Sequence, residues 1–112
     1  MSTPSKRKGS AWERDIAKYL VSQGWKHAER RVAGSTIDKG DIYGIIGCVI
    51  EAKNEKRIDL AGYLKELEIE MKNAKADTGV VMIKKRGTSD VGQAYAVLPI
   101  EIWVALMKAA GY

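Results

Sequence analysis

Two acids and a lysine stand at the two ends of the most strand-like part of the chain. Asp41 follows Lys39-Gly40, nine largely apolar residues separate it from Glu51, and Lys53 comes two positions later. Two carboxylates can hold a hard divalent cation such as Mg²⁺, and an ammonium beside them can stabilise negative charge. These residue types in this pattern are typical of metal-dependent hydrolysis of a phosphodiester.

The segment between the two acids predicts a β-hairpin that brings them together. It is rich in β-branched residues, and Gly47 suits the left-handed position that ends a three-residue loop over residues 45–47. This register places Asp41 opposite Glu51, with Cβ atoms about 4.5–5.5 Å apart. Lys53 shares a face with Glu51 because side chains alternate along a strand. Two like charges so placed are unfavourable without a cation, so we expect a metal site here.

The composition describes one basic domain. The chain has 112 residues, and 19 Lys and Arg against 14 Asp and Glu give a net charge of +5. This length supports one core, and the charge is compatible with a polyanionic partner. Cys48, the only cysteine in the sequence, excludes an internal disulfide and a multi-cysteine zinc site. No apolar run reaches the ~18 residues of a membrane span, and no signal-peptide core is visible, so we expect a cytoplasmic protein.

A capping pattern near the amino terminus predicts the first helix. Ser10 at the N-cap and Glu13 three residues later form a capping box, and Gly24 ends the segment. Glu13 therefore has a structural explanation beside any catalytic one. We expect residues 1–9 to be a flexible basic arm, because they are polar and contain three consecutive basic residues.

The rest of the chain alternates between strand-like and helix-like segments. The expected elements are a strand at 25–32, the hairpin from Asp41 to Glu51, a helix capped by Asp59 at 59–76, strands at 80–83 and 93–98, and a helix that begins at Pro99. This order predicts a single α/β domain over residues 10–112, with a central mixed β-sheet flanked by helices. We place three tryptophans in its core: Trp12, Trp25 and Trp103.

Four short segments carry a resemblance to a known family. They are Lys8-Gly9-Ser10-Ala11-Trp12-Glu13-Arg14, Gly34-Ser35, Lys39-Gly40-Asp41 and Glu51-Ala52-Lys53. Together they resemble the PD-(D/E)xK nuclease superfamily, specifically Holliday junction resolvases of the archaeal and phage-related type, from about Lys8 to the closing helix. The resemblance implies a restriction-endonuclease-like fold and Mg²⁺-dependent cleavage of four-way DNA junctions, with Mn²⁺ able to replace Mg²⁺. A phage-encoded relative would act in the host cytoplasm.

The same resemblance assigns roles to individual residues. It implies that Glu13, Asp41 and Glu51 contribute to the metal site, and that Lys53 assists catalysis. The backbone carbonyl of Ala52 would complete the metal site, and Ser35 would touch the scissile phosphate.

The chain departs from the family pattern at two points. Gly40 stands where the family name has a proline, and the helix expected at 59–76 carries no glutamine of the kind that many relatives have there. That helix offers several glutamates instead, and their role is left open.

Two further expectations concern partners. Basic residues that would contact the DNA backbone without reading its sequence are Lys6, Arg7, Lys8, Arg30, Arg31, Lys84, Lys85 and Arg86. Resolution of a four-way junction needs two opposed nicks, and one chain supplies one site. We therefore expect a homodimer with twofold symmetry.

Two other functions stay open. One is a related nuclease that acts on flap, nicked or duplex DNA, and the other is a DNA-binding module without turnover. The presence of Asp41, Glu51 and Lys53 argues against the second, because a non-catalytic module has no need to oppose two carboxylates. We expect recognition of DNA shape, since 112 residues leave no room for a separate sequence-reading domain.

Overall fold

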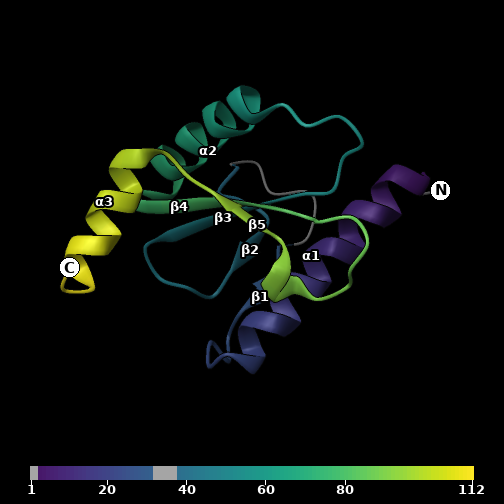
Figure 1. The fold of residues 1–112 in the computed structure, drawn as a ribbon, viewed down its shortest axis with the longest axis horizontal. Helices are drawn as coiled ribbons and strands as arrows, with labels where there is room; N and C mark the ends of the chain where they lie inside the picture. The colour runs from purple at the N-terminus through teal and green to yellow at the C-terminus, as the bar shows by residue number, and fades with distance from the viewer. Residues whose placement is uncertain (1–2, 32–37) are drawn as a thin grey trace.

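The computed structural model describes residues 3–31 and 38–112. In these residues the elements are, in order, α1 (Pro4–Ser22), β1 (Glu29–Arg30), β2 (Ile42–Tyr43), β3 (Cys48–Lys53), α2 (Leu60–Ala74), β4 (Thr78–Ile83), a 3-10 turn (Val91–Gln93), β5 (Tyr95–Val97) and α3 (Ile100–Ala109). The predicted order of helices and strands is confirmed. The described chain is one α/β domain with a mixed sheet (Figure 1).

The strands form one sheet in the order β1-β2-β3-β4-β5. β3 and β4 are parallel and are connected through α2, as a crossover between parallel strands requires, and the other neighbours are antiparallel. The hairpin has the predicted register, because Ile42 pairs with Ile50 and Gly47 takes a φ of 78°. Asp41 and Glu51 therefore meet where the hairpin joins the parallel pair.

Helices cover both faces of the sheet and divide the core into two parts. Trp12 of α1 packs with Ile50 of β3 on one face, and Leu67 of α2 packs with Val49 on the other. Figure 1 shows α2 above the sheet and α1 below it. Because side chains alternate along β3, Glu51 emerges on the same face as Val49. The candidate acid therefore faces α2.

The first helix begins earlier than predicted. Thr3 is its N-cap, and the Thr3 hydroxyl accepts a hydrogen bond from the backbone N–H of Lys6 at 3.1 Å. The predictions of a capping box at Ser10 and of an arm over residues 4–9 are therefore wrong. Pro4 explains the earlier start. Its fixed φ suits the first helical turn, and N–H groups in that turn have no acceptor within the helix, so proline loses no hydrogen bond there.

Two smaller predictions also need correction. In the described part of the strand expected at residues 25–32, only Glu29–Arg30 is a strand. Trp12 is buried and its indole N–H donates to the Met82 carbonyl at 3.0 Å, but Trp25 and Trp103 are 45% and 53% exposed. Trp103 lies in a helix with an apolar face, but that face does not pack on the sheet, and Trp25 lies outside any helix or strand.

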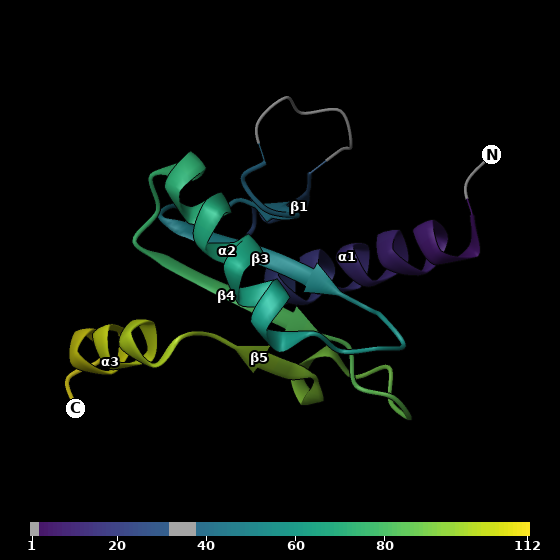
Figure 2. The same cartoon turned by 90° about the horizontal axis from the view of Figure 1, so that it is seen from above.

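The two helices after the hairpin differ in how they meet the sheet. Asp59 caps α2 as predicted, with its carboxylate accepting from the Gly62 N–H at 3.0 Å, and α2 packs along β3 and β4. In α3 only Ile102 is buried. Figure 2 shows α3 extending beyond one end of the sheet. None of the described helices is long and apolar enough to span a membrane.

Candidate active site

A half-open cleft of about 620 Å³ lies at the end of β3 and gathers the residues singled out by the sequence. Its walls include Glu13, Asp41, Glu51, Ala52 and Lys53. They come from α1, from the residue before β2 and from β3, whose end lies beside α1 (Figure 2). The tertiary structure thus brings into one cleft residues that are up to 40 positions apart in the sequence.

Asp41 is held against β3 by its backbone and its side chain. Its N–H donates to the Ile50 carbonyl at 2.9 Å, and its Oδ2 accepts from the Ala52 N–H at 2.8 Å. Gly40 permits this approach: its φ is 97°, and a Cβ there would lie 2.9 Å from Val49 Cγ1. Proline cannot adopt that φ, so glycine suits this position.

Glu51 is the most enclosed acid of the cleft. The residue is 3% exposed, and its Oε2 lies 3.5 Å from the Lys53 ammonium. Burial, followed by the neighbouring carboxylates of Glu66, Glu70 and Asp41, raises the pKa of Glu51 far above its ordinary value. Without a compensating cation this carboxyl group holds a proton.

Lys53 lies on the predicted face and is surrounded by acceptors. Its Nζ donates to both carboxylate oxygens of Glu66, at 3.0 and 3.3 Å, and lies over the Tyr63 ring. Burial alone would lower the pKa of Lys53, but the Glu66 hydrogen bonds and the nearby negative charges raise it above its ordinary value. Lys53 is therefore a fixed ammonium.

Glu13 links α1 to β1 instead of capping the helix. Its Oε1 accepts from Arg30 Nε at 3.2 Å, and the same guanidinium donates through Nη2 to Ser10 Oγ at 2.9 Å. Burial, and then the charge of Asp41, raises the pKa of Glu13. Glu13 and Asp41 line the same cleft, and the repulsion between their charges favours a shared cation.

Two carboxylates on α2 belong to the same region and had no role assigned from the sequence. Glu66 pairs with Lys53. Glu70 is 1% exposed, and neither of its oxygens has a hydrogen-bond donor among the described residues. Glu70 follows Tyr63 and Leu67 at spacings of four and three, so it stands in the core-facing stripe of α2. The sequence signal that could have identified Glu70 is an acid at a position that belongs to the apolar stripe of a helix.

The donor set of the cleft fits a hard divalent cation. The converging groups are carboxylates, which Mg²⁺ and Mn²⁺ prefer, and no histidine or cysteine lines the cleft in the described residues. A buried carboxylate without a partner, such as Glu70, costs on the order of several kcal/mol unless a proton or a cation compensates it.

Part of the predicted DNA-contacting set lies near this cleft. Lys8 lines it from α1. The Lys84 N–H donates to the Lys53 carbonyl at 3.0 Å, so the basic segment that follows β4 begins beside Lys53. Lys84 Nζ lies over the Trp12 ring, Lys85 is half-buried and Arg86 is exposed. Lys6 and Arg7 lie on the exposed first turns of α1.

The remaining residues that were predicted to contact DNA lie outside the cleft or outside the described residues. Arg31 lies over the Tyr43 ring, and its N–H donates to the Asp41 carbonyl at 2.7 Å. Arg30 is engaged with Glu13. Ser35 lies outside the described residues.

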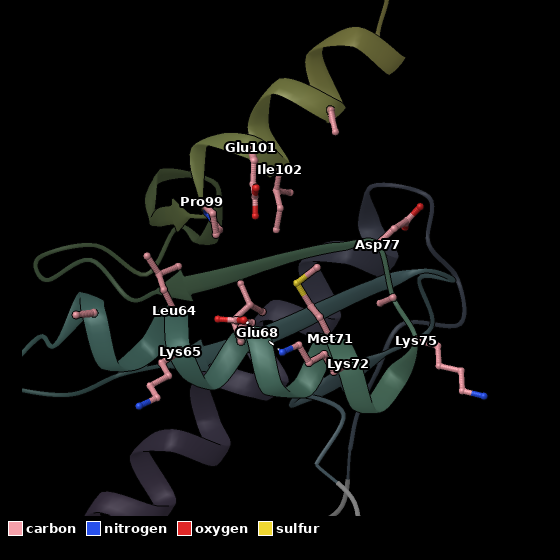
Figure 3. A pocket seen from close by; sticks show the side chains of 14 residues that line it. Leu64, Lys65, Glu68, Met71, Lys72, Lys75, Asp77, Pro99, Glu101 and Ile102 are labelled. Atoms are coloured by element: carbon pink, nitrogen blue, oxygen red, sulfur yellow. Dashed lines mark ion pairs between the residues drawn. The ribbon is translucent and has the colours of Figure 1, made fainter.

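A larger groove lies elsewhere in the described structure. It has a volume of about 830 Å³ and runs between α2 and α3, where Met71 and Ile102 point into it from the two helices (Figure 3). Charged side chains, among them Lys72 and Glu101, surround this apolar floor. The groove has the character of a packing surface, whereas the groups that can do chemistry gather in the cleft at the end of β3.

The functional assignment rests on this geometry and on the residues themselves. Comparison of the chain with protein-family models, with curated proteins and with solved structures found no match in any of the three.

Proposed function

We propose that the protein is a metal-dependent DNA endonuclease of the PD-(D/E)xK type, with a restriction-endonuclease-like fold and four-way junctions as its substrate. The observation that supports this most directly is the convergence of Glu13, Asp41, Glu51 and Lys53 in one half-open cleft. Three acids from different elements beside one ammonium match the needs of phosphodiester hydrolysis better than those of a structural ion-pair network.

Asp41 and Glu51, helped by Glu13, are the residues that would hold Mg²⁺. Bound Mg²⁺ supplies charge neutralisation at the phosphate and lowers the pKa of a water molecule. The half-buried position of Asp41 and its bond to the Ala52 N–H keep one carboxylate oxygen oriented along β3. Preorganisation of this kind keeps the ligands from having to reorient during reaction.

Lys53 acts as a positive charge and does not act as a base. Its contacts with Glu66 and Glu51 hold the ammonium in place and keep it protonated. A fixed ammonium at the end of β3 can donate to a phosphate oxygen and stabilise the charge that develops there. Glu66 is a positioning residue for Lys53.

The DNA backbone would approach over the open side of the cleft. Lys8 lies on one wall, and the backbone hydrogen bond from Lys84 to Lys53 shows that the 84–86 segment begins beside Lys53. Contacts from these residues position DNA without reading its sequence.

A homodimer formed through α3 would provide the second site. Ile100 and Trp103 are 79% and 53% exposed on α3, and Leu106 is 42% exposed. β5 runs antiparallel to β4 and delivers the chain to α3 at the end of the sheet opposite Lys53 (Figure 2). Pairing through α3 therefore buries an apolar surface and leaves both clefts open, as two opposed nicks require.

The test of the function is cleavage of labelled four-way junction, flap, duplex and single-stranded DNA in Mg²⁺. Paired symmetric nicks in the junction support the proposal. Cutting of flap or duplex DNA in preference to the junction would move the function to a related nuclease, and junction binding without cleavage by the unmodified protein would indicate a binding module. Absence of both binding and cleavage would overturn the proposal.

A further inference from the structure

Glu70 occupies a position that packing alone does not explain. It lies on the sheet-facing side of α2, is 1% exposed, and has no donor for either carboxylate oxygen among the described residues. The neighbouring core position, Leu67, is fully buried and apolar. A leucine or methionine at position 70 would satisfy the core, whereas a buried carboxyl group without a partner calls for a compensating proton or cation.

The unpartnered carboxylate is aimed at two other acids. One oxygen each of Asp38, Glu51 and Glu70 lie within 4.8 Å of one another. Oxygens bound to one Mg²⁺ or Ca²⁺ at about 2.0–2.6 Å are separated by at most about 4–5 Å. The three oxygens are therefore already close enough to share one ion.

The backbone around Asp38 is fixed in a way that maintains this arrangement. Asp38 Oδ1 accepts from the Gly40 N–H at 3.1 Å. The Asp38 carbonyl accepts from the side-chain amide of Asn73 at 2.8 Å. Asn73 lies on α2 three residues after Glu70, so one turn of α2 carries the acid and also anchors the loop that carries its neighbour.

The ammonium of Lys53 reaches only one member of this trio, Glu51. Lys53 contacts Glu51 Oε2 and the carboxylate of Glu66, and its ammonium is directed at those groups. Glu70 is absent from the walls of the cleft, whereas Asp38 and Glu51 line it. Asp38 and Glu51 therefore belong to the wall of the cleft, and Glu70 lies behind them on α2, accessible past the exposed Asp38.

We propose that Asp38, Glu51 and Glu70 form a binding site for a second hard divalent cation, of the Mg²⁺ and Mn²⁺ class. We call this the inner site. The outer site is formed by Asp41 and Glu13, and Glu51 contributes to both sites. The inference rests on the proposed function for its biological purpose, but its ligands and its test do not depend on cleavage. The cation ties the loop before β2 to α2 and thereby fixes the placement of Asp41.

The test is a Mn²⁺ titration of the full chain, with free Mn²⁺ measured by electron paramagnetic resonance. We expect two ions per chain in the unmodified protein and one in Glu70→Gln, with affinity at the inner site lowered by at least about 10-fold. Glu68→Gln, the same change on an exposed position of the same helix, is the matched control and should bind two ions. Asp38→Asn, on an exposed residue that cannot disrupt the core, should reproduce the loss.

The outcomes separate this inference from the proposed function. If Glu70→Gln and Asp38→Asn bind Mn²⁺ with unchanged number and affinity, the inner site is wrong even when the protein cleaves DNA. If both variants lose one ion and the unmodified protein cleaves no DNA, the inner site stands and the nuclease proposal fails. Thermal melting with and without Mn²⁺ gives a second readout, in which Glu68→Gln should gain the full Mn²⁺-dependent shift and Glu70→Gln only part of it.

Discussion

The two ends of the sheet have opposite characters. At the end of β3, carboxylates converge with the ammonium of Lys53 in a cleft, and one of these acids, Glu51, is buried. At the other end, where β5 leads into α3, apolar side chains such as Ile100 and Trp103 are exposed to solvent. Folding normally buries apolar groups and exposes charged ones, so both ends depart from the default in ways that a partner would correct.

The difference indicates which kind of partner would bind at each end of the sheet. Carboxylates that are crowded together before any ligand binds are stabilised by a cation and a phosphate. An exposed apolar helix is stabilised by another protein surface. The carboxylate cluster and the exposed apolar helix lie at opposite ends of the same strands, so a substitution can alter one of them without altering the other.

The largest expected effect is at the charged end. Asp41→Asn keeps an acceptor for the Ala52 N–H but removes a ligand charge, so we expect cleavage in Mg²⁺ to fall by at least about 10²–10³-fold with junction binding retained. Rates from labelled junction DNA measure this. Asp15→Asn, an exposed acid on α1, is the control and should cleave normally. Near-normal turnover in Asp41→Asn would remove this residue from the active site.

The second prediction compares α2 with α3. Leu67→Ala on α2 should lower the free energy of unfolding by about 2–5 kcal/mol, because Leu67 is fully buried between α2 and the sheet. Leu106→Ala on α3 should change it by about 0.5 kcal/mol or less at concentrations where the chain is monomeric. Urea unfolding of both variants measures the difference, and equal losses would show that α3 packs on its own chain.

The third prediction concerns α3 as a contact between copies. Trp103→Glu places a charge in the exposed apolar surface. We therefore expect the dissociation constant of the dimer to rise by at least about 30-fold, as for an interface hot spot worth about 2 kcal/mol. Sedimentation over a range of concentrations measures this. Nicking of each strand should continue, but paired cuts should become uncoupled. If the unmodified chain is a monomer that still makes paired symmetric cuts, the dimer is wrong.

The fourth prediction is a pH dependence of the metal-free protein. Burial raises the pKa of Glu70 from 4.5 to about 8. The folded chain therefore holds more protons than the unfolded chain between these values, and its stability falls as the pH rises through that range, by on the order of a few kcal/mol. Glu51, whose pKa is also raised, acts in the same direction.

Unfolding in EDTA at pH 5, 6.5 and 8 measures this slope. Glu70→Gln should flatten it, because the amide has no proton to lose, and excess Mg²⁺ should flatten it in the unmodified protein. Stability that rises from pH 5 to pH 8 in EDTA would show that Glu70 and Glu51 do not carry the effect.

The smallest expected effect is at the basic segment after β4. Replacing Lys85 and Arg86 with alanine should weaken DNA binding on all sequences and reduce the slope of log affinity against log salt by about 0.9 for each phosphate that the segment no longer neutralises. Lys84 is left unchanged because its ammonium also packs on the Trp12 ring. An unchanged slope would exclude this segment from the DNA interface.

Much of the charged end was predictable because its geometry is local. The alternation of side chains, the glycine in the hairpin loop and the pairing of Ile42 with Ile50 are set within about a dozen residues. The N-cap of α2 at Asp59 depends on a bond to a residue three positions away. Short-range rules of this kind also predicted the order of the elements.

Residues that depend on contacts between distant elements were missed or misjudged. Glu66 and Glu70 acquire a role only because α2 crosses the face of β3 that carries Glu51. Ser10 and Glu13 have the spacing of a capping box, but the guanidinium of Arg30, from β1, occupies both side chains.

The sequence by itself determined the pair of opposed acids, the lysine on their face and the α/β order, because hairpin register and helix capping follow from neighbouring residues. Only the tertiary structure decided which helix covers those acids and which helix remains exposed. α2 and α3 carry similar apolar periodicity, yet Leu67 is buried and Trp103 is not. Periodicity states that a helix has an apolar face, and the sheet that is available opposite that face determines whether it is buried.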